Sequence, residues 1–119
     1  MSNTTQPEFV YRLASIAEWE VAKATGKLPK REIDIKDGYF HLSTREQALE
    51  TARLHFAGAD DLLALEIPLA AIVDNVKFEL APKRGEAFPH FYGALCREHV
   101  ASAITLTRDG EGFSFGAFL

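Results

Sequence analysis

The stretch DGYFHLST at residues 37–44 combines a turn, a strand and the start of a helix. The Asp-Gly pair is typical of a tight turn, and the aromatic and apolar residues after it predict a strand over residues 39–42. Ser43, with Glu46 three residues later, is typical of a helix N-cap. Successive side chains of a strand point to opposite faces, so Tyr39 and His41 share a face. The stretch therefore predicts a histidine at the end of a strand, beside the first turn of a helix.

The flanking sequence predicts one α+β domain over residues 1–119. Residues 1–8 are expected to form a loose tail, and residues 27–38 and 81–87 to form loops. Ser15 and Glu18 have the spacing of a capping box for a helix over residues 16–25, which Gly26 ends. A second helix runs from Ser43 to Gly58, and residues 68–72 form one helical turn. Strands are expected over residues 9–13, 39–42, 61–67, 76–80, 88–95, 100–107 and 112–118. About two main helices in the N-terminal half and six to seven strands favour mixed or antiparallel sheets over a doubly wound parallel sheet.

Composition narrows the classes of function. The chain has 119 residues, of which 47% are hydrophobic and 25% charged, and its net charge is −4. A mildly acidic chain is a poor candidate for sequence-independent nucleic-acid binding, which needs a basic face. The one cysteine, Cys96, excludes an intrachain disulfide. The N-terminus is polar, and the longest apolar stretch, residues 62–73, is too short for a membrane helix. We therefore expect a cytoplasmic protein without a membrane partner.

His41 and Ser43 are the first candidate site residues. A helix N-terminus offers free N–H groups and the positive end of a dipole, which suit a phosphate. Histidine titrates near neutral pH and can donate a hydrogen bond to a phosphate or a ribose hydroxyl. Two alternatives stay open. Ser43 could serve only as a cap, and His41 could be a half-buried strand residue bonded to backbone.

The segment FPHFYG at residues 88–93 supplies the second group of candidates. His90 and Tyr92 share a strand face, and their rings could stack on a base or on nicotinamide, unless the segment is only a packed core strand. Arg12 could bind phosphate or carboxylate, or pair with Glu18. Glu79 alternates with apolar residues and is expected to face solvent. No third ligand at a recognisable spacing accompanies His41 and His90, so no metal site is expected.

Four segments together resemble a known family. FVYRLAS at residues 9–15, DGYFHLST, DLLALEI at residues 61–67 and FPHFYGAL at residues 88–95 occur in an order similar to that of the bacterial domain-of-unknown-function family 952. The resemblance covers residues 9–106. That family is similar in fold to the ADP-ribosyltransferase superfamily. In it, the His-Leu-Ser segment resembles a motif of RNA 2′-phosphotransferases, which hold a phosphate and use NAD.

The resemblance implies an ADP-ribosyltransferase-like fold and NAD as cofactor. It makes His41, His90 and Tyr92 candidate catalytic residues, and Arg12, His41, Ser43 and Tyr92 candidate cofactor contacts. The chain departs from the phosphotransferases in lacking their His-Gly-Thr on the first strand and an evident late-strand glutamate, for which Glu79 is the candidate.

These residues lead to three hypotheses about the function. The first is a domain that binds NAD or a related nucleotide phosphate and transfers ADP-ribose. The second is a non-catalytic module that binds a nucleotide or a protein. The third is an interaction domain that uses an exposed C-terminal strand, with Phe113, Phe115, Phe118 and Leu119.

Overall fold

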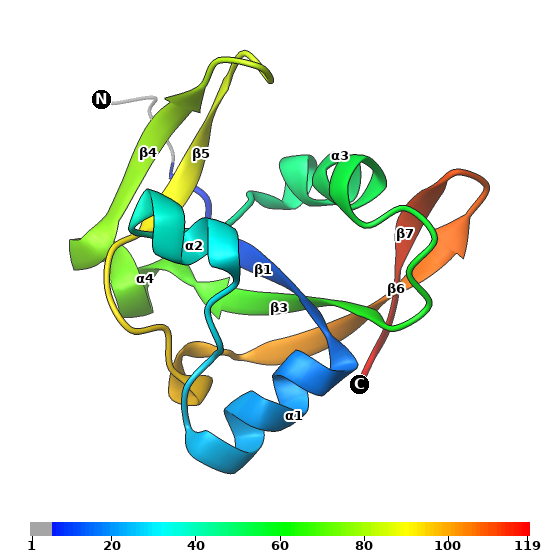
Figure 1. Cartoon of the computed structure of the whole chain (residues 1–119), viewed down its shortest axis with the longest axis horizontal. Coiled ribbons are helices and arrows are strands. Elements are labelled where there is room, and N and C mark those ends of the chain that lie inside the picture. The colour runs from blue at the N-terminus through cyan, green and yellow to red at the C-terminus, as the bar shows by residue number, and fades with distance from the viewer. Residues whose placement is uncertain (1–5) are drawn as a thin grey trace.

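The computed structural model describes residues 6–119, which form two antiparallel sheets with helices packed around them (Figure 1). The larger sheet has the order β1-β3-β6-β7 and the smaller one the order β2-β5-β4. The strands of the larger sheet are β1 (Phe9–Ser15), β3 (Leu62–Pro68), β6 (Ser102–Asp109) and β7 (Gly112–Phe118). Those of the smaller sheet are β2 (Phe40–His41), β4 (Val76–Ala81) and β5 (Glu86–Phe91).

Two longer helices cover opposite faces of the larger sheet. Helix α1 (Ile16–Thr25) begins at the capping box of Ser15 and Glu18 and ends at Gly26, whose φ of 85° is left-handed. Helix α3 (Arg45–His55) begins at Thr44, whose side chain accepts a hydrogen bond from the Gln47 amide. Figure 1 shows the two helices on either side of β1.

Shorter helical segments join the strands. They are α2 (Glu32–Asp37), α4 (Leu69–Ile72) and the 3₁₀ turns η1 (Val73–Asn75) and η2 (Arg97–His99). Helix α2 lies in front of β1 and β5 in Figure 1. All of its residues except Asp34 are exposed. One buried carboxylate therefore anchors this helix.

The core has two parts, one on each face of the larger sheet. Trp19 and Ala22 of α1 pack with Leu63 and Leu65 of β3, and this part continues to Phe40 in the smaller sheet. On the other face, the α3 residues Ala48 and Ala52 pack against side chains that include Tyr11, Leu13, Ile104 and Phe113. Alternation along β1 and β3 produces this division, because successive side chains enter opposite layers.

A backbone bridge joins the two sheets. The Tyr11 amide donates to the Ser43 carbonyl at 2.7 Å, and the Ser43 amide donates to the Tyr11 carbonyl at 2.9 Å. The Leu42 amide donates to the Pro89 carbonyl at 3.1 Å. These bonds fix the residues that follow β2, and with them the start of α3.

The α+β class, the antiparallel pairing and the seven strands agree with the sequence predictions. Several boundaries differ. Helix α2 lies inside the expected 27–38 loop, and the cap of α3 is Thr44 instead of Ser43. Strand β2 covers only Phe40–His41 of the expected 39–42, and β5 runs over Glu86–Phe91 instead of 88–95, so Tyr92 lies just past its end. Of the expected tail, residues 1–5 lie outside the described residues, and the Glu8 carbonyl accepts a hydrogen bond from Leu69. Within residues 6–119, every helix falls short of the length and apolarity that a membrane span requires.

Candidate functional site

His41 lies directly opposite His90 in the pairing of β2 with β5. Directly paired residues of an antiparallel sheet share a face, so the two imidazoles lie on the same side of the smaller sheet. Their ring centroids are 5.8 Å apart. The structure thus brings together the two histidines that the sequence singles out in separate motifs.

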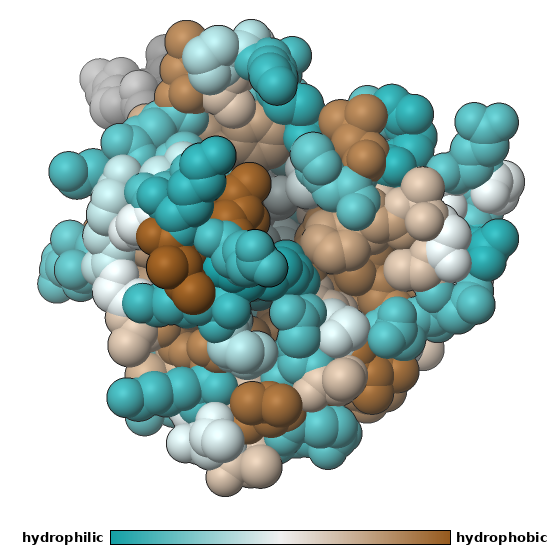
Figure 2. All heavy atoms as spheres, in the orientation of Figure 1, coloured by the Kyte–Doolittle hydropathy of each residue, from teal (hydrophilic) through white to brown (hydrophobic). Residues whose placement is uncertain are grey.

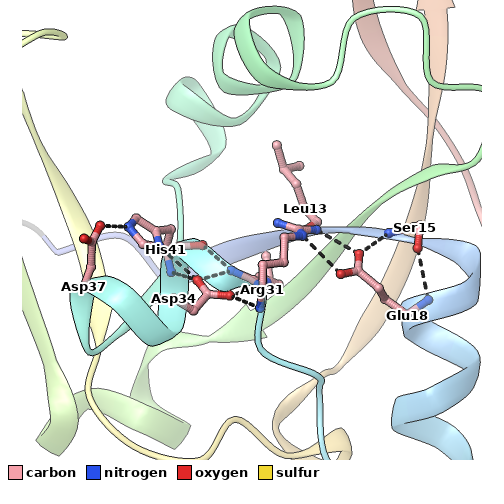
Figure 3. Close-up of polar contacts among 8 residues, drawn as sticks. Leu13, Ser15, Glu18, Arg31, Asp34, Asp37 and His41 are labelled. Carbon is pink, nitrogen blue, oxygen red and sulfur yellow. Dashed lines mark hydrogen bonds and ion pairs between the residues drawn. The ribbon is translucent and has the colours of Figure 1, made fainter.

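The buried carboxylate of Asp34, which pairs with Arg12, also contacts His41, and Figure 3 shows Asp34 and Asp37 on two sides of the imidazole. The Asp34 carboxylate, whose side chain is fully buried, accepts hydrogen bonds from Arg12 Nη2 at 2.6 Å, Arg12 Nη1 at 3.1 Å and His41 Nδ1 at 2.9 Å. Burial raises the pKa of Asp34, but the hydrogen bonds from His41 and Arg12 outweigh burial and hold that pKa well below its usual range. Asp34 is therefore an anion that orients the imidazole.

Arg12 lies behind His41 instead of facing a ligand. Only 2% of Arg12 is exposed, and its guanidinium is occupied by Asp34 and by the His41 carbonyl at 3.2 Å. This placement corrects the expectation that Arg12 contacts a cofactor, because the group has no free surface to offer. Its role is to neutralise Asp34 and so to position His41.

The second nitrogen of His41 is also bonded. Nε2 lies 2.9 Å from Asp37 Oδ2, at the end of α2. A neutral imidazole has a single N–H, so donation to both Asp34 and Asp37 requires the protonated ring. The Asp37 side chain is 32% exposed, whereas that of Asp34 is fully buried. Asp37 is thus the partner that an incoming group could displace.

An aromatic and acidic cluster adjoins His41 on the same sheet face. The Tyr39 ring stacks on His90 with centroids 3.9 Å apart and an interplanar angle of 17°. Glu79 Oε1 accepts from His90 Nδ1 at 2.8 Å and from the Tyr92 hydroxyl at 2.6 Å. The hydrogen bond to Glu79 raises the pKa of Tyr92 to about 12. Tyr92 therefore stays protonated at neutral pH and acts as a donor to Glu79.

Glu79 lies only partly where the alternation of β4 predicts. It contacts His90 and Tyr92, whereas Phe78 and Leu80 on the other face are 36% and 65% exposed. The expectation of a solvent-facing Glu79 is therefore met only in part, because its side chain is 39% exposed but its carboxylate is bonded to His90 and Tyr92. The donated hydrogen bonds, first that of Tyr92 and then that of His90, lower the pKa of Glu79 and keep it ionised.

His41 also lines a cavity of about 380 Å³, which the rings of the aromatic cluster do not line. This volume is in the range of small-molecule sites. The polar lining includes His41, Ser43, Thr51 and Arg84, and the apolar lining includes Ile33 and Phe88. No acidic side chain of residues 6–119 lines it. Figure 2 shows a hollow between α2 and α3, with apolar side chains over α2 at its edge.

The candidate residues are therefore divided between two neighbouring regions that meet at His41. His41 and Ser43 line the cavity, whereas His90 and Tyr92 belong to the aromatic cluster. Ser43 is 3% exposed, and its hydroxyl lies 3.4 Å from that of Thr51. Sequence reasoning missed Asp34 and Thr51, as well as Arg84 within the expected 81–87 loop. Within residues 6–119, no three His, Cys, Asp or Glu side chains are placed to hold a metal ion together.

A family model described as "Protein of unknown function (DUF952)" matches residues 13–103, which contain both histidines of this site. The chain belongs to this family. The resemblance that the sequence motifs indicate is thereby confirmed, while the likeness of DUF952 to ADP-ribosyltransferases stays a prediction.

Two solved structures of protein CC0527 from Caulobacter crescentus are similar to this DUF952 chain. The X-ray structure has 35% identity and a TM-score of 0.80, and the match covers 88% of this chain and 91% of that one. The solution NMR structure has 35% identity and a TM-score of 0.78, with coverage of 89% and 90%. No curated protein matches the chain. Neither the family description nor these structures name an activity, so the function is argued from the side chains.

Proposed function

We propose that this domain binds NAD or a related nucleotide phosphate in the cavity beside His41. One observation carries the proposal: His41, fixed by the buried Asp34–Arg12 pair, lies where a largely apolar cavity, to which residues 6–119 contribute no acidic side chain, meets a stacked aromatic cluster. A fixed N–H donor suits a phosphate or a ribose hydroxyl. The half-buried rings of Tyr39 and Tyr92 suit contact with a flat heterocycle.

Ligand binding would use the exposed side of His41. The ligand oxygen takes the position of Asp37 at Nε2, and Asp34 keeps Nδ1 bonded. The imidazole then donates to the ligand without losing its orientation. Because Asp34 stays ionised and Arg12 stays paired with it, the charge behind the ring does not change during this exchange.

Transfer of ADP-ribose is the reaction that we propose for the bound dinucleotide. The bond between ribose C1′ and the nicotinamide nitrogen breaks, and its electron pair stays on the leaving nicotinamide. The positive charge that develops on the ribose needs a nearby anion. Glu79 is the candidate, because Tyr92 and His90 keep it ionised. The acceptor then forms a bond to C1′ and releases its proton to a base.

The alternative is a module that binds the nucleotide without reacting. The double bonding of His41 favours this alternative, because both ring nitrogens are occupied by carboxylates in the structure. The two functions differ in whether free nicotinamide appears when NAD is added.

An NMR titration of labelled protein with NAD tests the binding. Saturable shifts of the His41 and His90 ring signals are expected, while the His99 ring, which accepts a hydrogen bond from the Cys96 amide, serves as an internal reference. His41→Ala should abolish the shift of the remaining His90 signal, and Asp37→Ala should strengthen binding because no carboxylate has to be displaced. Unchanged His41 and His90 signals at saturating NAD would overturn the proposal for this ligand.

A further inference from the structure

Arg84 differs from the other charged groups that line the cavity. Arg31 is paired with Glu18 at 2.8 Å, and His41 with Asp34 and Asp37. Arg84 has no carboxylate within 4.0 Å among residues 6–119. Arg84 is therefore the arginine in the lining that makes no ion pair among residues 6–119, and the exposed Glu50, which pairs with Arg53, acts on it only from a longer distance.

The geometry of Arg84 is fixed although its charge is unpaired. Nη1 donates to Thr51 Oγ1 at 3.0 Å, and the guanidinium carbon lies 4.6 Å from the centroid of the Phe88 ring. Nη2 is buried and has no hydrogen-bond partner in the described part of the chain. Buried guanidinium N–H groups are normally bonded, so an unbonded one in a cavity wall indicates a place for an acceptor.

Thr51 adds a second unused donor. Its hydroxyl oxygen accepts from Arg84 and, at 3.4 Å, from Ser43. These two bonds occupy the acceptor side of the oxygen, so the hydroxyl hydrogen is left to donate. An oxygen-rich anion that bridges Arg84 and Thr51 would satisfy both donors. Carboxylates would disfavour such an anion, and none lines the cavity within residues 6–119.

We infer that the Arg84–Thr51 end of the cavity is a subsite for a phosphate group, with the apolar part of the ligand lying against Phe88 and Ile33. This inference rests on the proposed nucleotide binding and assigns the two ends of the ligand: the phosphate to Arg84 and the sugar to His41. Arginine suits this role because its planar fork binds two phosphate oxygens at once.

Isothermal titration with ADP, adenosine and inorganic pyrophosphate tests the subsite. Arg84→Gln should weaken ADP binding by about tenfold or more, because a charge-assisted hydrogen bond is lost, and should leave adenosine binding unchanged. Thr51→Val should weaken ADP binding in the same direction by a smaller factor. Arg108→Gln is the matched control, since Arg108 is exposed, pairs with Asp60 and lies outside the cavity lining.

The outcomes separate this inference from the proposed function. Equal ADP affinity of wild type and Arg84→Gln, with NAD still bound, would overturn the subsite and leave the function standing. Binding of pyrophosphate that Arg84→Gln abolishes, without binding of NAD, would support the subsite and overturn the function. A wild-type chain that binds none of the three probes would overturn both. An amide NMR spectrum of each variant shows that the fold is intact.

Discussion

Arg12 contacts His41 and Arg84 lines the same cavity as His41, but the surroundings of the two arginines differ. Arg12 is 2% exposed and bonded twice to a buried carboxylate, whereas Arg84 has a hydroxyl and an aromatic ring as neighbours and one nitrogen without a partner. The comparison teaches that a partner carboxylate decides what an arginine does. Arg12 and Asp34 form a buried pair that positions His41, and we call this pair the framework. Arg84, which makes no ion pair among residues 6–119, is free to bind an anion from solution.

The largest effect is expected from breaking the framework pair. Asp34→Asn leaves the Arg12 guanidinium buried and uncompensated, so the free energy of unfolding should fall by about 3–5 kcal/mol. Urea unfolding measures this loss. Asp37→Asn is the matched control, because Asp37 also bonds His41 but is exposed, and its loss should cost less than about 1 kcal/mol. Equal effects of the two substitutions would contradict the framework role.

The same pair predicts the response to acid. Burial raises the pKa of Asp34, but hydrogen bonds from His41 and Arg12 lower it further, below the ordinary 3.8 of the unfolded chain. Ionised Asp34 therefore stabilises the fold fully above about pH 5, and this contribution is lost as the pH falls through the unfolded and then the folded pKa. In urea unfolding, the stability difference between wild type and Asp34→Asn should shrink from pH 7 to pH 2. A constant difference would show that the Asp34 charge is not coupled to folding.

A spectroscopic effect is expected at the aromatic cluster, on the other side of His41 from Arg84. Glu79→Gln removes the anionic acceptor, so the pKa of Tyr92 should fall from about 12 toward the ordinary 10.0. Carbon NMR of labelled tyrosine over a basic pH range measures this change. Glu66→Gln, which affects Tyr11, should leave the Tyr92 curve in place. A Tyr92 pKa that stays raised in Glu79→Gln would mean that another group holds the hydroxyl.

The smallest effect on stability is expected at Arg84. Arg84→Gln loses one hydrogen bond to Thr51 and the stacking on Phe88, but it also removes a buried nitrogen without a partner. The free energy of unfolding should stay within about 1 kcal/mol of wild type. A loss as large as that of Asp34→Asn would place Arg84 in the framework and remove the contrast between the two arginines.

The sequence predicts the parts of the fold that local bonds determine. Ser15, Glu18 and Gly26 set both ends of α1, because the cap and the left-handed stop are made within the helix itself. Helix α2 cannot be predicted from local sequence in this way. It has six residues, and Ile33 and Ile35 are exposed on it. Its anchor, Asp34, bonds Arg12, which is 22 residues away in the sequence.

The site was predictable where one face of one strand carries it. His41 is paired with His90, and Tyr92, one residue past the end of β5, reaches the same cluster because it and His90 both bond Glu79. Alternation along β4 separates Glu79 from Phe78 and Leu80, but it does not say which of the two faces is the more covered one. Local sequence places Arg12 in a strand and Arg84 in a loop, but it does not say which of the two has a carboxylate partner. The difference lies in Asp34 and Thr51, which only the tertiary fold brings to them.

The two-residue length of β2 has a consequence for amide hydrogen exchange. Two paired positions, Phe40 with Phe91 and His41 with His90, join the β4–β5 hairpin to β2, whereas β1 and β3 are paired along seven. Regions with few ordered hydrogen bonds open locally before the whole chain unfolds. The hairpin should therefore exchange its amide protons faster than β1. Thr51 and Gln47 of α3 already donate to or accept from the hairpin, and an anion held by both Arg84 and Thr51 would add to these bonds and slow that exchange.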